Sequence, residues 1–241
     1  MNIAIIFAGG KGTRMGSQIP KQFLEINGRP ILIYTLDLFQ SNKKIDKIYI
    51  STLEEYIPYV KELTQKYQIT KVIDVIKGGE TAQDSIYNAL KRAEKDNPGD
   101  SIVLLHDGVR PYVDLNIIDE NINSVKKYGS AITSIPAYET IMISKDTDWV
   151  NSVTTRKETY IGQAPQSFYL KEILEAHETI RNSPSGYENM VDACTIYKAL
   201  GKKVHLVRVN RGNLKITTPE DVFIFKAFLE FKEYRQTFEI F

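Results

Sequence analysis

The strongest constraint on the fold is an alternation of two kinds of segment along the chain. Short runs rich in β-branched residues predict strands, and longer runs with apolar residues three or four positions apart predict amphipathic helices. The expected strands are residues 3–8, 47–52, 71–76, 101–106, 131–136 and 203–209, and the expected helices are 30–39, 54–67, 81–95, 115–127, 170–181, 188–200 and 219–234. This alternation is typical of an α/β fold with a mostly parallel sheet, helices on both faces and ligands at the carboxyl ends of the strands.

One segment, residues 137–168, breaks this alternation. It is rich in Thr, Tyr and Ile, lacks a helical stripe and has a cluster of turn residues at positions 145–148. We interpret it as a β-hairpin arm, residues 137–160, with a return segment, both projecting from the main sheet. Because a hairpin cannot bury both of its faces alone, the arm predicts a partner subunit and hence a homodimer. We expect residues 1–241 otherwise to form a single domain.

Composition excludes several classes of function. The chain carries 31 Lys and Arg against 30 Asp and Glu, a net charge of +1, which argues against a protein that coats nucleic acid or anionic membrane. No apolar run is long enough to cross a bilayer, and the N-terminal MNIAIIFAGG does not resemble a signal peptide. A single cysteine rules out an internal disulfide, and three scattered histidines do not suggest a zinc cluster. We therefore expect a cytoplasmic protein that binds neither nucleic acid nor membrane.

The first predicted strand runs directly into a glycine-rich loop, FAGGKGTRMG, at residues 7–16. Glycines let backbone amides turn toward an anion without obstruction by a Cβ atom, and Lys11 and Arg14 add positive charge. The loop does not contain the P-loop string GxxxxGK[ST], and it departs from the dinucleotide-binding GxGxxG because Met15 stands at the third glycine. Glycines and bases directly after the first strand predict a polyphosphate site, without saying which reaction occurs there.

Further motifs along the chain extend this interpretation. They are GGKGTRMG followed by PKQFLEINGRPILIYTL, GGETAQDSIYNAL (78–90), HDGVRPYV (106–113), TTRKETYIGQAPQSF (154–168), DAC (192–194) and NLKITTPEDV (213–222). In this order they resemble the cytidylyltransferases that act on polyol phosphates, over essentially the whole chain. The resemblance implies a three-layer nucleotidyltransferase fold that uses CTP and a polyol phosphate and releases pyrophosphate. It also implies Mg²⁺, bound mainly through the CTP phosphates.

The resemblance assigns a role to individual residues of this chain. The implied catalytic cations are Arg14, Lys21 and Lys215. The implied nucleotide-binding residues are Ala8, Gly9, Gly10, Gly12, Thr13, Met15, Gly79, Glu80, Ser85 and Gly108, with Gly79, Glu80 and Ser85 against the cytosine. The implied polyol-phosphate residues are Asp107, Thr140 and Arg156, and Asp107 is also the implied metal ligand. Thr140 and Arg156 lie on the arm, which in the family reaches into the neighbouring subunit's site.

Three other residues of these motifs have no implied catalytic or binding role. We expect His106 to orient or pack, Arg110 to pair with a carboxylate, and Cys194 to pack as a small apolar residue rather than to act as a nucleophile. The implied reaction needs no strong base, because the attacking phosphate oxygen is already an anion. Catalysis of this kind depends on positioning and on fixed positive charge.

The identity of the second substrate is less constrained than the chemistry. Methylerythritol-type enzymes usually read TPQ and TD(D/E)A, whereas this chain reads Ala164-Pro165-Gln166 and Val191-Asp192-Ala193. The difference favours ribitol 5-phosphate, used for teichoic acid or capsule, and leaves 2-C-methyl-D-erythritol 4-phosphate, used for isoprenoids, as the alternative. A sugar-1-phosphate nucleotidyltransferase also fits GGKGTRM. An inactive CTP-binding regulator is allowed by the changes at 164 and 191 and by Ala82, where the family usually has arginine.

Overall fold

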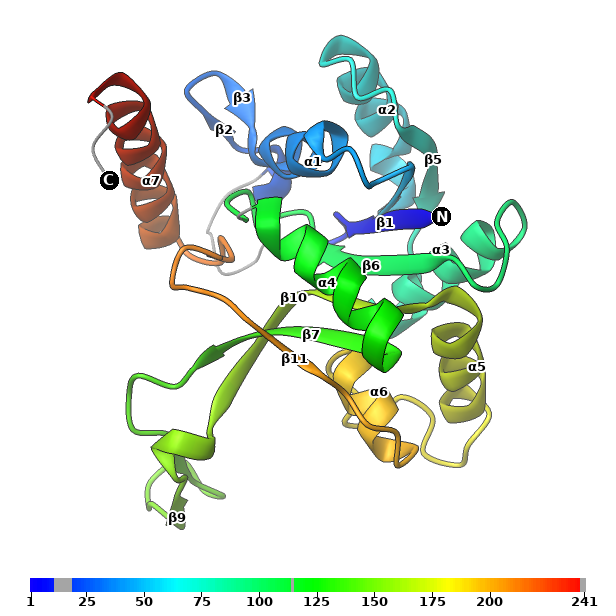
Figure 1. Cartoon of the computed structure of the whole chain (residues 1–241), viewed down its shortest axis with the longest axis vertical. Helices are drawn as coiled ribbons and strands as arrows, with labels where there is room; N and C mark the ends of the chain where they lie inside the picture. Colours follow the sequence, from blue (N-terminus) through cyan, green and yellow to red (C-terminus); the bar gives the residue numbers. More distant parts are fainter. Residues whose placement is uncertain (11–18, 114, 239–241) are drawn as a thin grey trace.

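The chain folds around one seven-stranded sheet in a computed structural model that describes residues 1–10, 19–113 and 115–238 (Figure 1). Its strands are β1 (Asn2–Phe7), β4 (Lys47–Thr52), β5 (Val72–Lys77), β6 (Ile102–Asp107), β7 (Ser130–Pro136), β10 (Tyr160–Tyr169) and β11 (Leu206–Arg208). They lie in the order β11-β7-β10-β6-β1-β4-β5, and β10 alone of these seven runs antiparallel to its neighbours. The mostly parallel sheet that the alternation predicts is confirmed.

Helices cover both faces of this sheet. One apolar layer is closed by α1 (Ile31–Ser41), α2 (Ile57–Lys66) and α4 (Leu115–Tyr128), and the other by α3 (Ala82–Glu94), α5 (Leu170–Arg181) and α6 (Ala193–Ala199). In β1, Ala4 and Ile6 point into the first layer and Ile3 and Ile5 into the second, because successive strand side chains alternate. At the margin, α7 (Pro219–Phe238) packs near the hairpin of β2 (Glu25–Ile26) and β3 (Arg29–Pro30) (Figure 1).

Every expected helix and strand forms, and the largest shift of a boundary is at α6. We expect a helix over 188–200, but α6 begins at Ala193. The side chain of Asp192 accepts a hydrogen bond from the Thr195 amide at 2.8 Å, and the Thr195 hydroxyl accepts one from the Asp192 amide at 3.1 Å. This capping box satisfies two of the free amides at a helix start and so fixes the boundary.

The prediction that the return segment leaves the main sheet is wrong. Residues 160–169 form β10, which pairs with β7 on one side and with β6 on the other. The pairing with β7 is irregular between Gly162 and Gln166, around Pro165. Glycine and proline at this irregularity hide the strand pattern in the sequence, because both residues are unfavourable inside a regular strand.

The rest of the segment lies away from the sheet. Here β8 (Met142–Ile143) pairs antiparallel with β9 (Ser152–Val153), and the lower part of Figure 1 shows them beyond the end of β10. A short 3-10 helix, η4 (Arg156–Glu158), leads from β9 back to β10. In the described part of the chain, no helix has the length and apolar character that a membrane crossing needs.

A buried polar network holds α4 to the irregular part of β10. The side-chain amide of Asn121, on α4, donates to the Thr133 hydroxyl at 2.9 Å and accepts from the Ser167 hydroxyl at 3.0 Å. Thr133 in turn donates to the Pro165 carbonyl at 2.6 Å. The side chain of Asn121 is fully buried, as are those of Thr133 and Ser167. Buried polar groups are costly when unpaired, so each member depends on the others.

We expect Asn121→Ala to lower the free energy of unfolding by about 2–4 kcal/mol, because it removes the acceptor of the buried Ser167 hydroxyl and a donor to the buried Thr133 hydroxyl. Urea denaturation of the purified protein measures this. Asn123, exposed on the same helix, provides the matched control, and Asn123→Ala should change stability by less than about 0.5 kcal/mol. Equal effects of the two variants would contradict the stabilising role of the network.

Candidate active site

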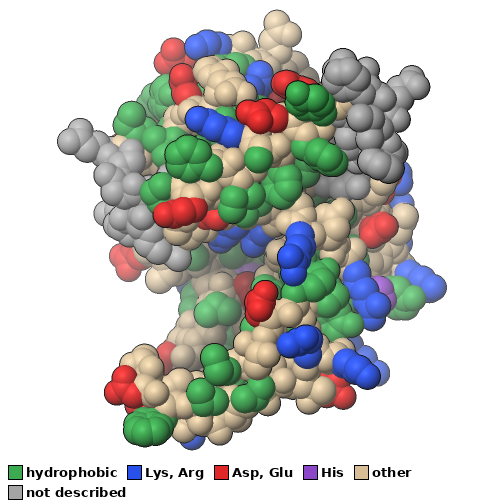
Figure 2. All heavy atoms as spheres, turned by 90° about the vertical axis from the view of Figure 1, so that its left-hand side faces the viewer, with side chains coloured by type: hydrophobic (Ala, Val, Ile, Leu, Met, Phe, Trp, Pro, Cys, Tyr) green, Lys and Arg blue, Asp and Glu red, His purple; other side chains and the backbone are tan. Residues whose placement is uncertain are grey.

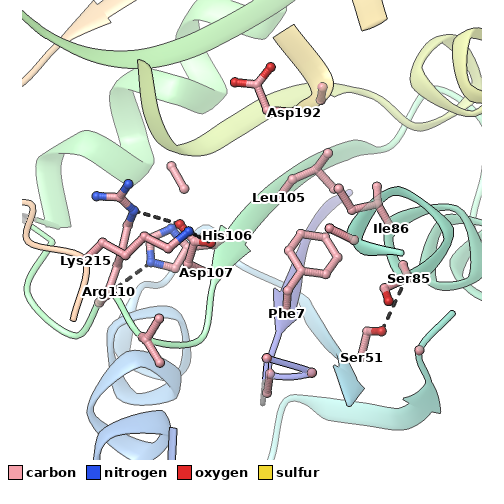
Figure 3. A pocket seen from close by; sticks show the side chains of 18 of the residues that line it. Phe7, Ser51, Ser85, Ile86, Leu105, His106, Asp107, Arg110, Asp192 and Lys215 are labelled. Atoms are coloured by element: carbon pink, nitrogen blue, oxygen red, sulfur yellow. Dashed lines mark hydrogen bonds and ion pairs between the residues drawn. The ribbon is translucent and has the colours of Figure 1, made fainter. Parts of the chain in front are cut away.

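A cavity of about 590 Å³ lies at the carboxyl ends of β1, β4 and β6, and Figure 3 shows it from close by. The ends of parallel strands are where open α/β sheets bind their ligands. Three walls and a charged cluster at the end of β6 line it. The walls are the segment after β1 together with η2 (Lys21–Phe23), the start of α3 with the loop before it, and β10 with the start of α6.

The first wall begins with the glycines that follow β1. Ala8, Gly9 and Gly10 line the cavity together with Lys21 and Gln22. The side-chain amide of Gln22 donates to the Ala8 carbonyl at 2.6 Å, which ties η2 to the end of β1. Lys21 lines the cavity and is nevertheless largely buried, so the surrounding protein restricts its side chain. The wall therefore places a lysine beside the backbone of Gly9 and Gly10, which have no side chains to block a ligand.

The remaining loop residues implied by the resemblance are Lys11, Gly12, Thr13, Arg14 and Met15. They lie outside the described residues, and their roles stay predictions.

The second wall is the turn between β5 and α3. The Ser85 hydroxyl accepts from the Gly79 amide at 2.9 Å and donates to the Thr81 carbonyl at 3.0 Å, which folds the turn against the helix start. A Cβ atom at Gly79 would lie 2.2 Å from the Cβ of Asp84, so only glycine fits there. Gly79, Glu80 and Ser85 all line the cavity, as does Ser51 at the end of β4.

A charged cluster lies at the end of β6. One carboxylate oxygen of Asp107 accepts from the Lys215 ammonium at 2.8 Å, and the other accepts from the Arg110 Nε at 2.8 Å. Burial alone would raise the pKa of Asp107, but the charges of Lys215 and Arg110 lower it to about 2. Asp107 is therefore ionised at neutral pH. The expected pairing of Arg110 with a carboxylate is confirmed.

His106 lies behind this cluster and is fully buried. Its Nε2 is 3.2 Å from the Arg110 carbonyl, and its ring lies 5.0 Å from that of Phe39. Burial lowers the pKa of His106 to about 4, so the ring is neutral at physiological pH. These contacts show that His106 packs behind the cluster, in line with the expectation that it orients or packs.

The third wall brings the GQAPQ and DAC motifs together. The Gln166 side chain donates to an Asp192 carboxylate oxygen at 2.8 Å and accepts from the Cys194 amide at 3.0 Å. Asn213, from NLKITT, donates to the Ala164 carbonyl at 2.7 Å. Cys194 packs against the second apolar layer, and burial raises the pKa of its thiol, which suits a packing residue.

A divalent cation fits this site only if the substrate supplies most of its ligands. Within the described ranges no group of three or more His, Cys, Asp or Glu side chains could hold a metal. Asp107 offers one ionised carboxylate, and from the described residues each of its oxygens accepts one hydrogen bond. Mg²⁺ is commonly bound by one or two carboxylates together with substrate phosphates and water. The donor set of this cavity matches that mode of binding.

The structure gathers most of the implied site residues that it describes. Ala8, Gly9, Gly10, Lys21, Gly79, Glu80, Ser85, Asp107 and Lys215 all line the one cavity. Gly108 does not: its amide donates to the Phe7 carbonyl at 2.8 Å, and its own carbonyl accepts from the Thr35 hydroxyl at 3.0 Å. A Cβ atom at Gly108 would lie 2.9 Å from the Phe7 carbonyl, so the glycine permits close packing behind the site.

Two further implied residues, Thr140 and Arg156, are on the arm and do not line the cavity of their own chain. They lie close to each other, with Arg156 donating to the Thr140 hydroxyl at 3.3 Å.

Sequence reasoning missed Phe7, Gln22 and Ser51, which also line the cavity. Phe7 and Ser51 lie at the carboxyl ends of predicted strands. The rule that ligands bind at this edge of the sheet could have found them.

Comparison with known proteins gives consistent results. A family model described as IspD: 2-C-methyl-D-erythritol 4-phosphate cytidylyltransferase matches residues 2–231. The chain is 46% identical over 239 residues to a ribitol-5-phosphate cytidylyltransferase of Vibrio parahaemolyticus, which covers 99% of this chain and 100% of that protein. It is 39% identical over 229 residues to a 2-C-methyl-D-erythritol 4-phosphate cytidylyltransferase of Clostridium botulinum, with 95% and 97% covered.

Solved structures share the same architecture. A crystal structure of 4-diphosphocytidyl-2C-methyl-D-erythritol synthase from Anaerococcus prevotii superposes with a TM-score of 0.80 at 29% sequence identity. The match covers 95% of this chain and 96% of that chain. The similarity therefore extends over the sheet, both helical layers and the cavity.

Proposed function

We propose that this chain, which belongs to the IspD family of cytidylyltransferases, transfers the cytidylyl group of CTP to ribitol 5-phosphate. The observation that carries the proposal is the arrangement of Lys21, Lys215 and Asp107 around one cavity that also contains the Gly79–Ser85 turn. The 46% identity to a ribitol-5-phosphate cytidylyltransferase supports this polyol over the methylerythritol alternative. So do Ala164 and Val191, where methylerythritol-type enzymes usually have threonine.

The proposed reaction joins two anions. A phosphate oxygen of ribitol 5-phosphate attacks the α-phosphorus of CTP, the bond from that phosphorus to the bridging oxygen of the β-phosphate breaks, and pyrophosphate leaves with the bonding electrons. No proton has to be removed from the attacking phosphate. The described residues contribute positive charge from Lys21 and Lys215, both of which line the cavity. Fixed charges aimed at a developing anion are a major source of catalytic rate.

We also propose that a divalent cation binds together with CTP, mainly through the CTP phosphates. When bound, it would neutralise charge on the phosphates and orient them for attack. Asp107 is the residue that would contact it, while Arg110 and Lys215 keep that carboxylate ionised and in place. We also assign Arg14 to the triphosphate by family resemblance.

The second part of the proposal concerns the arm, residues 137–160. Thr140 and Arg156 lie outside their own cavity, so we propose that a partner subunit's arm delivers these two residues in a homodimer. The arm carries exposed apolar side chains that suit a protein interface: Met142, Ile143, Trp149, Val150 and Val153, with Trp149 75% exposed. In the side view of Figure 2, a hollow separates the arm from the body of the molecule.

Pyrophosphate release over a grid of nucleotides and polyol phosphates tests the proposed reaction. We expect release with CTP and ribitol 5-phosphate, the pair that the similarity to a ribitol-5-phosphate cytidylyltransferase supports. Release with 2-C-methyl-D-erythritol 4-phosphate alone would reject the proposed polyol. Release with UTP or dTTP and a sugar 1-phosphate would favour the sugar nucleotidyltransferase. Tight binding of CTP with no release under any saturating polyol phosphate would favour an inactive regulator.

Lys21→Ala should lower kcat at least about a hundredfold, the scale of one lost charge donor, without unfolding the protein. Steady-state pyrophosphate release measures kcat, and circular dichroism checks the fold. Lys43→Ala removes the same charge from an exposed position in the turn after α1 and should leave kcat unchanged. A folded Lys21→Ala variant with nearly normal turnover would remove Lys21 from the catalytic role.

Mixed dimers test the proposed exchange of arms. Arg156→Ala and Lys21→Ala subunits should each be nearly inactive alone, but their mixed dimer keeps one site with both residues intact. Random mixing of equal amounts should therefore restore up to about a quarter of the wild-type rate, given one intact site in half of the dimers. Native mass spectrometry verifies that mixed dimers form. Their failure to recover activity would show that Lys21 and Arg156 serve a site within one chain.

A further inference from the structure

We infer that the aromatic ring of Phe7 is the platform on which the cytosine ring of CTP stacks, an inference that rests on the proposed function. Phe7 is the last residue of β1, directly before the glycine loop. Its side chain is partly exposed and lines the cavity. In Figure 3 the ring lies between Ser51 and Ser85 on one side and His106 and Asp107 on the other.

The register of the sheet determines which residues lie beside Phe7. Phe7 is paired with Ser51 of β4 on one side and with Asp107 of β6 on the other. Residues paired across neighbouring strands present their side chains to the same face, so Ser51, Phe7 and Asp107 form one row along the edge of the sheet. Because neighbouring strands are about 4.8 Å apart, the row spans roughly 9.6 Å between its outer backbones. A nucleoside monophosphate is about this long.

The two ends of the row differ in chemistry. Near Ser51 lie the Ser85 hydroxyl and the backbone of Gly79, whose oxygens can accept hydrogen bonds from the amino edge of a base. At the opposite end, Lys215 contacts Asp107 and offers positive charge to a phosphate. A nucleotide placed between these ends must cross Phe7.

Packing within the protein covers only part of the surface of the Phe7 side chain. Ile3 and Ile5, which point to the same face of β1, are fully buried in the second apolar layer. Phe7 packs against the edge of that layer, where Ile86 and Leu105 also line the cavity. The rest of its surface faces the cavity, so an apolar aromatic surface is available to a ligand.

A flat aromatic ring offers more to a pyrimidine than an aliphatic side chain does. Bases stack on aromatic side chains through their π-faces, and this contact has no requirement for a particular hydrogen-bond pattern. In this cavity the stack would fix the plane of the base while the Gly79–Ser85 turn reads its edge. Phe7 would then raise the affinity of the cavity for the nucleoside part of CTP and would not change the contacts made by the triphosphate.

Calorimetric titration of CTP and of inorganic tripolyphosphate into wild type, Phe7→Leu and Phe7→Tyr tests this. We expect Phe7→Leu to raise the Kd of CTP by about tenfold to a hundredfold, the scale of one lost stack. Phe7→Tyr keeps the ring and should stay within about threefold of wild type. The Kd of tripolyphosphate should be the same in all three proteins, which a general disruption of the cavity would not allow.

A second variant keeps the test independent of how well Phe7→Leu folds. Phe7→Trp in a Trp149→Phe background carries its single tryptophan in the cavity, because Trp149 is the only tryptophan of the chain. CTP should quench its fluorescence, and tripolyphosphate should not.

Equal affinity of wild type and Phe7→Leu for CTP, or a parallel loss of CTP and tripolyphosphate binding, would overturn the role of Phe7 and leave the proposed reaction standing. Failure of the wild type to bind CTP would overturn both.

Discussion

The carboxylate of Asp107 holds Lys215 with one oxygen and Arg110 with the other, and the geometry of the cavity depends on this pairing. The two cations approach from different segments: Arg110 follows β6, and Lys215 lies just before α7. Each cation would repel the other without the anion between them. A charge that is partly buried needs such partners, and removal of one member leaves the others poorly compensated.

The same cluster reaches the wall formed by β10. Arg110 donates to the carbonyl of Asn213 at 2.9 Å, and the Asn213 side chain donates to the carbonyl of Ala164. From there the contacts continue through Pro165 and Thr133 to the buried amide of Asn121 on α4. The charged cluster and the wall formed by β10 are thus joined by one connected set of hydrogen bonds. Networks of this kind favour a single arrangement because a partial one leaves buried groups unsatisfied.

The sequence carried enough information to predict the sheet and most of the helices. Lys47–Thr52 forms the predicted strand, and Leu170–Arg181 forms the predicted helix. Each segment has an apolar pattern that fits only one type of secondary structure. The strand β10 was missed because Gly162 and Pro165 interrupt its pattern and because its place between β6 and β7 depends on contacts far away in sequence. Strand pairing of this kind is decided by tertiary packing rather than by local preference.

The sequence predicts only those residues of the candidate site that belong to recognisable motifs. Lys21, Asp107 and Lys215 could be assigned because their motifs resemble a known family, whereas composition and periodicity alone leave each as an ordinary charged residue. Gly108 belongs to one of these motifs, yet it serves the packing of β6 against β1. Phe7 has no motif of its own, and its position follows only from the register of β1 with its neighbours.

The irregularity in β10 divides that strand into two parts with different attachments. Residues 166–168 are paired on both sides, with β6 and with β7, whereas residues 160–162 pair with β7 alone and continue into the arm. The inner part forms a wall of the cavity, and the outer part connects the sheet to the arm. The arm can therefore change in length or charge during evolution while the strand beside β6 stays in register, so that the arm diversifies independently of the cavity.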